Sequence, residues 1–177
     1  GRGAGEALRI ASPHALVIAA GYAIVLDAMP LAEEGQWNLL ALELAVAGLI
    51  FGMGTFLAVA LFKWMLQGRY RKRNTPMWTP FVWLSEAATN MYEGIAVPNF
   101  LRYLRGTPWL PLALNLLGTR IATSAYLDTT DMTEFDCVQI GAHSELNALC
   151  CPQTHLFEDR GMKIDDVGVG AKLTCGP

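Results

Sequence analysis

Residues 44–62 decide the fold class: they read LAVAGLIFGMGTFLAVALF, nineteen consecutive residues without a formal charge. A second apolar run, residues 10–26, has seventeen such residues and extends through Asp27 to Leu31. A bilayer core needs roughly 20 mostly apolar residues at helical rise. The two runs therefore predict a transmembrane hairpin with spans at about 10–31 and 39–66. Buried core helices and a signal peptide are the alternatives, but a second span argues against a removable signal.

Charged residues flank these runs unevenly. Arg2 and Arg9 precede the first run and GRYRKR (residues 68–73) follows the second, whereas the connecting residues 30–38 contain Glu33 and Glu34 and no base. Basic flanks stay on the cytoplasmic side. We therefore expect a multi-pass protein of the plasma membrane with both ends in the cytoplasm. Small residues four apart, Gly48 and Gly52, favour contact with another helix of a larger protein or a second copy.

Charge also divides the 177 residues along their length. Residues 1–126 carry ten Lys and Arg against seven acids, and residues 127–177 carry three against nine. With 53% hydrophobic residues, the composition excludes a disordered chain and a disulfide-rich miniature fold. We expect a basic membrane hairpin at 1–73, a linker at 74–118 and a small acidic domain at 119–177.

The linker interleaves aromatic with basic side chains, which is typical of a segment lying in the lipid headgroup layer. The same interleaving occurs in nucleic-acid-binding proteins, but the segment is not strongly basic and has no such motif, so nucleic acid is not an expected partner. The residues concerned are Trp78, Phe81, Trp83, Tyr92, Phe100, Arg102, Tyr103, Arg105 and Trp109.

Aliphatic residues recur at six-residue steps in the last third of the chain, and small residues stand at the fifth place of each step. Leu146 follows Ile140 by six residues, Ile164 enters the same frame eighteen later, and Ile121 and Leu127 form an earlier pair one residue out of frame. This hexapeptide pattern predicts an all-β left-handed parallel β-helix of about three coils, in which each six-residue side turns one aliphatic residue inward. We expect it to be incomplete, because the last rung, before Pro177, has no cap. A small irregular β domain is the alternative.

Candidate catalytic residues gather in the acidic part. His155, Glu158 and Asp159 lie within five residues. A neutral imidazole can take a proton from an attacking amine, and carboxylates attract a cationic one. His143 is the second candidate, since a surface histidine of a hexapeptide acyltransferase does this work; a solvent-facing loop histidine is the alternative for both. The four cysteines lack Cys-x-x-Cys spacing, so we expect them to pack and no metal site to form.

Several stretches resemble the membrane C-terminal region of ε-poly-L-lysine synthetase and related nonribosomal peptide synthetases. The resemblance covers about residues 65–177, and the spans match only in kind. Its most specific parts contain DTTD and THLFEDR. The stretches are PNFL (98–101), GTP (106–108), LG (117–118), YLDTTDMTEFDCVQIG (126–141) and QTHLFEDRGMK (153–163).

This resemblance implies the membrane-embedded part of a larger ligase that joins amino acids such as lysine through isopeptide bonds. Adenylation and carrier domains precede the membrane region in that family. They and the lipid bilayer are the implied partners, and ATP and phosphopantetheine are expected on those domains, with no cofactor in this segment. Two alternatives remain open: a non-catalytic membrane scaffold for such a synthetase, and a membrane-attached hexapeptide acyltransferase. The paired-histidine motif of condensation enzymes is absent from the sequence.

Overall fold

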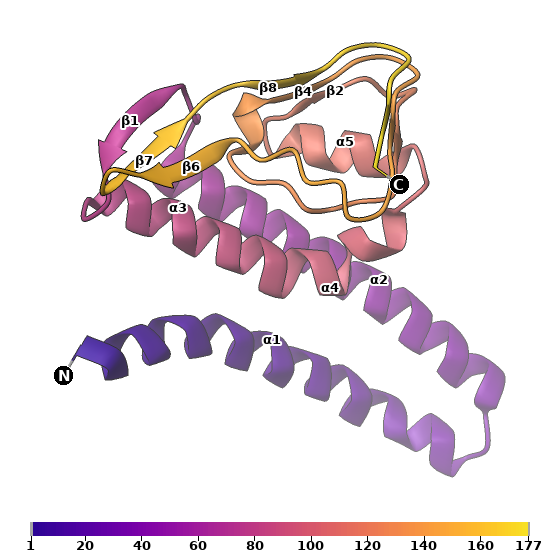
Figure 1. Cartoon of the computed structure of the whole chain (residues 1–177). Coiled ribbons are helices and arrows are strands. Elements are labelled where there is room, and N and C mark those ends of the chain that lie inside the picture. The colour runs from indigo at the N-terminus through magenta and orange to yellow at the C-terminus, as the bar shows by residue number, and fades with distance from the viewer. Residues whose placement is uncertain (1, 177) are drawn as a thin grey trace.

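The computed structural model describes residues 2–176, with side chains from His14 onward. Helix α1 (Arg2–Glu33) and helix α2 (Trp37–Phe62) form an antiparallel hairpin (Figure 1). Gly35 closes it with a φ of 71°, a conformation that glycine adopts at little steric cost. Segments 14–33 and 37–67 are long and apolar enough to cross a membrane. The side chains of Arg2 and Arg9, and residue Pro177, lie outside the described part of the chain.

Helical segments continue from α2 into the linker. A π-helical turn extends α2 until Gly68, where φ reaches 67°, and α3 begins with Pro80 at a position that needs no amide donor. Gly52 of α2 lies against the carbonyl of Asn99, so the two segments approach closely. The elements are η1 (Lys63–Gln67), β1 (Arg73–Pro76), α3 (Pro80–Met91), η2 (Tyr92–Ala96), α4 (Val97–Asn99), η3 (Leu101–Leu104) and α5 (Trp109–Leu116).

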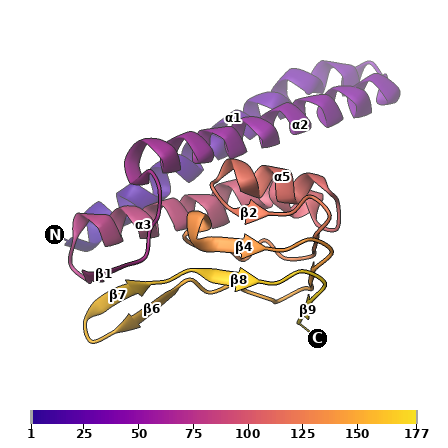
Figure 2. The same ribbon diagram turned by 90° about the horizontal axis from the view of Figure 1, so that it is seen from above.

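Short strands and one 3₁₀ turn form the rest of the structure. Two three-stranded sheets are parallel, with orders β2-β4-β8 and β3-β5-β9, and the third is antiparallel, with order β1-β7-β6. Figure 2 shows β2, β4 and β8 side by side, with the β6–β7 hairpin projecting beyond them. The elements are β2 (Arg120–Ile121), β3 (Tyr126–Leu127), η4 (Phe135–Cys137), β4 (Val138–Ile140), β5 (Glu145–Leu146), β6 (His155–Glu158), β7 (Gly161–Ile164), β8 (Val167–Val169) and β9 (Thr174–Cys175).

The predicted fold class, an all-β left-handed parallel β-helix beside the membrane hairpin, is wrong. The fold is mixed α/β: several short strands make three small sheets, none of them closed, and helices supply much of the structure. Ile164 is not a parallel rung, because it pairs antiparallel with Arg73 and His155. The inserted β6–β7 hairpin interrupts the repeat, and Val169 instead of Ile164 pairs with Ile140.

One apolar core joins the helices to the strands. It runs from Phe56 and Val59 of α2 through Leu110 and Leu114 of α5 to Ile140 of β4. A buried ion pair adds to it: Lys63 Nζ lies 2.6 Å from Asp136 Oδ2, with 1% and 5% of the side chains exposed. The end of the second long helix is thus fixed to the turn that precedes β4.

Candidate functional site

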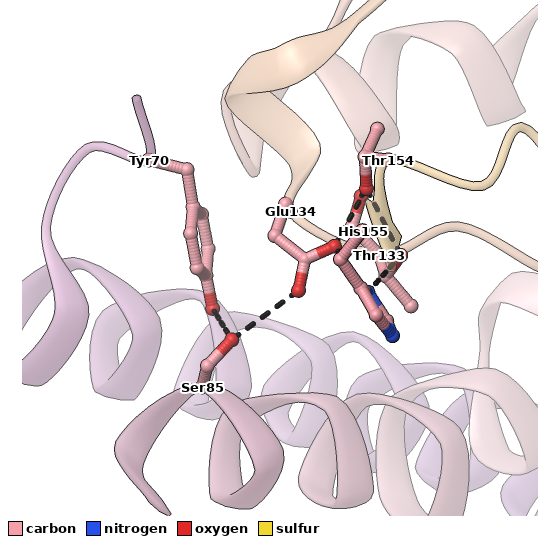
Figure 3. Close-up of polar contacts among 6 residues, drawn as sticks. All are labelled: Tyr70, Ser85, Thr133, Glu134, Thr154 and His155. Carbon is pink, nitrogen blue, oxygen red and sulfur yellow. Dashed lines mark hydrogen bonds and ion pairs between the residues drawn. The ribbon is translucent and has the colours of Figure 1, made fainter. Parts of the chain in front are cut away.

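A buried carboxylate, Glu134, lies at the centre of a polar cluster between α3 and the strands (Figure 3). Its side chain is 1% exposed, and its backbone has a left-handed φ of 38°. A non-glycine residue in this conformation costs of order 1 kcal/mol and persists only where neighbours fix it. Oε2 accepts a hydrogen bond from Thr154 Oγ1 at 2.6 Å. The buried carboxylate is therefore held in one orientation.

His155, the first residue of β6, contacts the same carboxylate. Its Nδ1 lies 2.8 Å from Glu134 Oε2, and Thr133 Oγ1 is 3.5 Å from this nitrogen. The side chain is 19% exposed, and the Phe157 ring packs edge-on against the imidazole at 5.0 Å between centroids. In Figure 3 the other ring nitrogen points away from the cluster. A carboxylate that accepts a hydrogen bond from Nδ1–H keeps the proton on Nδ1 and leaves Nε2 as the unprotonated nitrogen of the neutral ring.

The two groups shift each other's protonation. The hydrogen bond to Glu134 raises the pKa of His155, burial opposes the shift, and the charges of Glu134 and Glu86 add to it. Burial acts to raise the pKa of Glu134, but hydrogen bonds from His155 and Thr154 outweigh it, so this pKa lies below its ordinary value. The pair is thus most strongly bonded where the carboxylate is ionised and the imidazole protonated.

Two hydroxyl groups complete the cluster on the side of α3. Ser85 Oγ lies 3.4 Å from Glu134 Oε1 and 3.2 Å from the Tyr70 hydroxyl. Ser85 is the donor in both contacts, and because a serine hydroxyl has one proton, it donates to Glu134 or to Tyr70 at any one time. Burial raises the pKa of Tyr70, which keeps the phenol protonated and able to donate.

Further carboxylates act electrostatically on groups in this part of the structure. Glu86 is close enough to raise the pKa of His155. Burial raises the pKa of the neighbouring Cys151 thiol, and the charges of Asp131, Glu93 and Glu134 raise it further.

The other predicted site residues lie apart from this contact. Glu158 and Asp159 stand at the tip of the β6–β7 hairpin, where both carboxylates face Lys163 at 2.7 Å and 3.5 Å. His143 is exposed in the turn between β4 and β5, and its backbone amide donates to Ser124 Oγ. Sequence reasoning missed Glu134, although the quoted DTTDMTE stretch contains it, because its partner is 21 residues away.

Among the described residues, no three His, Cys, Asp or Glu side chains gather in a way that could hold a metal ion. Cys137 is buried, and burial raises the pKa of its thiol to about 12, far from a reactive thiolate. The arrangement at His155 therefore has the chemistry of proton transfer by an imidazole oriented through a carboxylate.

Together, fold and site define a mixed α/β unit with a histidine–carboxylate pair beside two long apolar helices. The chain is 56% identical over 169 residues to delta-poly-L-ornithine synthetase of Acinetobacter baumannii. The match covers 96% of this chain and 13% of the relative, so the chain spans a small part of that synthetase. It supports the predicted relation to poly-amino-acid synthetases. No protein-family model and no solved structure matches the chain.

Proposed function

We propose that this chain is the membrane-embedded part of a nonribosomal synthetase that joins cationic amino acids through amide bonds, with His155 as its general base. The observation that carries the proposal is the buried 2.8 Å contact between His155 Nδ1 and Glu134. The name of the relative, a poly-ornithine synthetase, supports a diamino acid as the monomer. Ornithine and lysine both present an amine that is cationic at neutral pH.

The chemistry assigns separate roles to the two residues. Nε2 of His155 accepts a proton from the amine nitrogen as that nitrogen forms its bond to an activated acyl carbon. The imidazolium then returns the proton to the leaving group as the old acyl bond breaks, so the histidine ends unchanged. Glu134 fixes the tautomer and stabilises the transient imidazolium without touching the amine. It is therefore a positioning residue.

The carboxylates near His155 have an electrostatic role in this proposal. The charge of Glu86 reaches His155, whose pKa it helps to raise, and a negative charge there favours a cationic substrate. Glu158 and Asp159 contribute less, because Lys163 neutralises much of their charge and all three are solvent-accessible. His143 remains the second candidate base.

The proposal also places the chain in a bilayer. Segments 14–33 and 37–67 would span the plasma membrane as a hairpin, with both ends cytoplasmic because GRYRKR follows the second span. Residues 74–118 would lie at the headgroup layer and 119–177 in the cytoplasm. Adenylation and carrier domains of the whole enzyme, with their ATP and phosphopantetheine, would deliver the activated amino acid, and further helices or a second copy would cover the hairpin.

The test is chain extension by the whole enzyme with His155→Gln, and with His143→Gln as the matched control. Removing a general base costs a factor of about 10²–10⁴, so extension by the first variant should fall that far while adenylation is unchanged. The control should extend chains at nearly the wild-type rate. The reverse result would move the base to His143.

Two other functions predict different results. A non-catalytic membrane scaffold predicts that both histidine variants extend chains normally, provided that they fold and insert. A membrane-attached acyltransferase predicts transfer from a soluble acyl donor by the isolated chain, which is a separate measurement. The match to a synthetase segment covers 96% of this chain, which favours the synthetase over these two alternatives.

A further inference from the structure

A polar cavity whose lining does not include His155 lies where the second long helix ends. Its volume is about 370 Å³, and it opens between residues 69–72, which follow η1, and the edge of the β2-β4-β8 sheet. Nine residues line it: Arg69, Tyr70, Arg71, Lys72, Gly118, Arg120, Asp136, Gln139 and Asp166. Four of these side chains are basic and two are acidic.

Of the two acids, Asp136 is engaged by buried groups, and Asp166 acts electrostatically on Lys72. Asp136 is already bonded to Lys63 at 2.6 Å and to the Tyr70 amide at 3.1 Å, with Arg69 at 3.7 Å. Lys72 pairs outside the cavity with Asp165 at 2.7 Å. Arg71 and Arg120 form no ion pair with any side chain that the structure describes, and both are exposed. Two arginines from distant parts of the chain thus line one cavity, and neither is held in an ion pair with a described side chain.

Gly118 leaves space in the lining of this cavity that a larger residue would fill. Gly118 has a φ of 114°, and a Cβ atom there would lie 2.6 Å from Asp136 Oδ1. A side chain at this position would displace the carboxylate that holds Lys63 and the Tyr70 amide. The glycine therefore preserves both the space and the buried ion pair beneath it.

We propose that this cavity binds a phosphate group through Arg71 and Arg120, with Arg69 and Lys72 adding positive charge. A guanidinium presents a planar fork of donors that matches phosphate oxygens, and such charge-assisted bonds are strong. A single carboxylate would engage fewer of the converging donors than a tetrahedral phosphate. The proposal concerns a different surface from the His155 site and goes beyond the proposed amide-forming reaction.

Two kinds of molecule could supply the phosphate group, given where the cavity lies. The cavity adjoins the end of a segment long enough to span a membrane, at the level where anionic phospholipid headgroups lie and basic juxtamembrane residues are attracted to them. A soluble phosphate ester has the same recognition chemistry. The two sources differ in whether a bilayer is needed.

The test compares both sources on the full chain. Inorganic phosphate is titrated calorimetrically into the chain in an uncharged detergent. Phosphatidylglycerol retention is measured by native mass spectrometry after extraction from nanodiscs that mix it with phosphatidylcholine. The variant Arg71→Gln/Arg120→Gln should weaken binding at least about tenfold, given the strength of charge-assisted hydrogen bonds. The control Arg102→Gln/Lys172→Gln removes two exposed charges outside the cavity and should bind as wild type.

A second variant keeps both arginines. Gln139→Glu adds a negative charge to the cavity lining with little change in size, and it should also weaken binding. If the wild type binds inorganic phosphate and both cavity variants lose this binding, the result supports a soluble phosphate ester. If the wild type retains only phosphatidylglycerol and both cavity variants lose it, the result supports a lipid headgroup. The proposal is overturned if neither ligand binds, if the control variant loses as much affinity as the double variant, or if Gln139→Glu binds as wild type.

Discussion

Replacing Glu134 by glutamine tests the central contact of the candidate site. The carboxylate accepts two short hydrogen bonds on Oε2, from Thr154 at 2.6 Å and from His155 at 2.8 Å. A glutamine oxygen at that position keeps both bonds, and its amide can face Ser85. The substitution therefore removes charge while preserving shape and bond number.

The cost follows from the difference between two kinds of hydrogen bond. A bond to a charged group contributes about 1.5–3 kcal/mol and a neutral one about 0.5–1.5 kcal/mol. Two bonds that each lose about 1 kcal/mol lower the free energy of unfolding by about 2 kcal/mol. Residues of the pair are 1% and 19% exposed, so solvent screens this contact little.

The directions of the two pKa shifts determine how the cost of Glu134→Gln depends on pH. The pKa of His155 is raised above its ordinary 6.5, so its contribution is complete below that value and is lost as pH rises through the folded-state pKa. The pKa of Glu134 is depressed below 4.5, so its contribution is present above that value and is lost as pH falls through the folded-state pKa. Glu134→Gln should therefore cost most between about pH 4.5 and 6.5 and less near pH 9.

Urea unfolding of the full chain in uncharged detergent measures this cost at about pH 6 and about pH 9. Glu93→Gln, an exposed carboxylate on η2, is the matched control and should change stability by less than about 0.5 kcal/mol. Combining Glu134→Gln with His155→Gln in a double-mutant cycle isolates the pairwise energy. A coupling near zero, or an equal cost at both pH values, would refute the reasoning.

Three further predictions concern the fold and its orientation. Leu146→Asp buries an unpaired charge at a fully buried position and should lower the free energy of unfolding by more than about 4 kcal/mol. Leu156→Asp, at a 56% exposed position, should change it by less than about 0.5 kcal/mol in the same urea measurement. Equal effects of the two substitutions would contradict the burial of Leu146. Gly52→Ala places a Cβ against the carbonyl of Asn99 and should lower the free energy of unfolding by about 1–3 kcal/mol. Gly48→Ala meets open space and should leave the stability unchanged or raise it. Thermal unfolding in detergent measures both variants, and equal melting temperatures would contradict this packing. Cys151 is exposed after the second span, so an impermeant thiol reagent should label it only in permeabilised cells, and labelling of intact cells would place residues 68–177 outside.

The long helices were predictable because their signal is local. Runs of uncharged residues and the Glu33–Glu34 turn between them are visible in the sequence, and the structure contains two helices long and apolar enough to span a membrane. The aliphatic positions at six-residue steps also predicted part of the strand pairing. Ile121 pairs with Ile140, and Leu127 with Leu146, in parallel register, and all four are buried. The fold class inferred from them was nevertheless wrong.

The β6–β7 hairpin explains much of that error. Asp159 and Arg160 form its two-residue turn with φ values of 51° and 58°, a geometry that favours Asn-Gly or Asp-Gly. Asp-Arg carries only half of that signal, so the sequence did not indicate where the parallel repeat stops. Ile164 then fitted the six-residue frame by position, although it belongs to an antiparallel sheet.

The site was only half predictable for a related reason. His155 was a candidate because it stands among acids, but the nearby Glu158 and Asp159 are paired with Lys163. The acid that contacts it, Glu134, is placed by a left-handed backbone conformation and by packing against α3. Neither feature has a sequence signature at this residue type, because left-handed backbone favours glycine, asparagine and aspartate over glutamate.

Glu134 and Asp136 lie in one short turn and connect the site to the membrane segment. Glu134 faces His155, whereas Asp136 faces Lys63 at the end of the segment that is long enough to span. Tyr70 contacts Asp136 directly, through its amide, and is linked to Glu134 through Ser85, which lies within hydrogen-bond distance of both the Tyr70 hydroxyl and the carboxylate. Because breaking a buried ion pair leaves an uncompensated charge and is strongly destabilising, the turn has one stable position relative to the helix end. The imidazole of His155 is consequently held at a defined place relative to the two long helices by buried polar contacts, which the hydrophobic core alone does not specify.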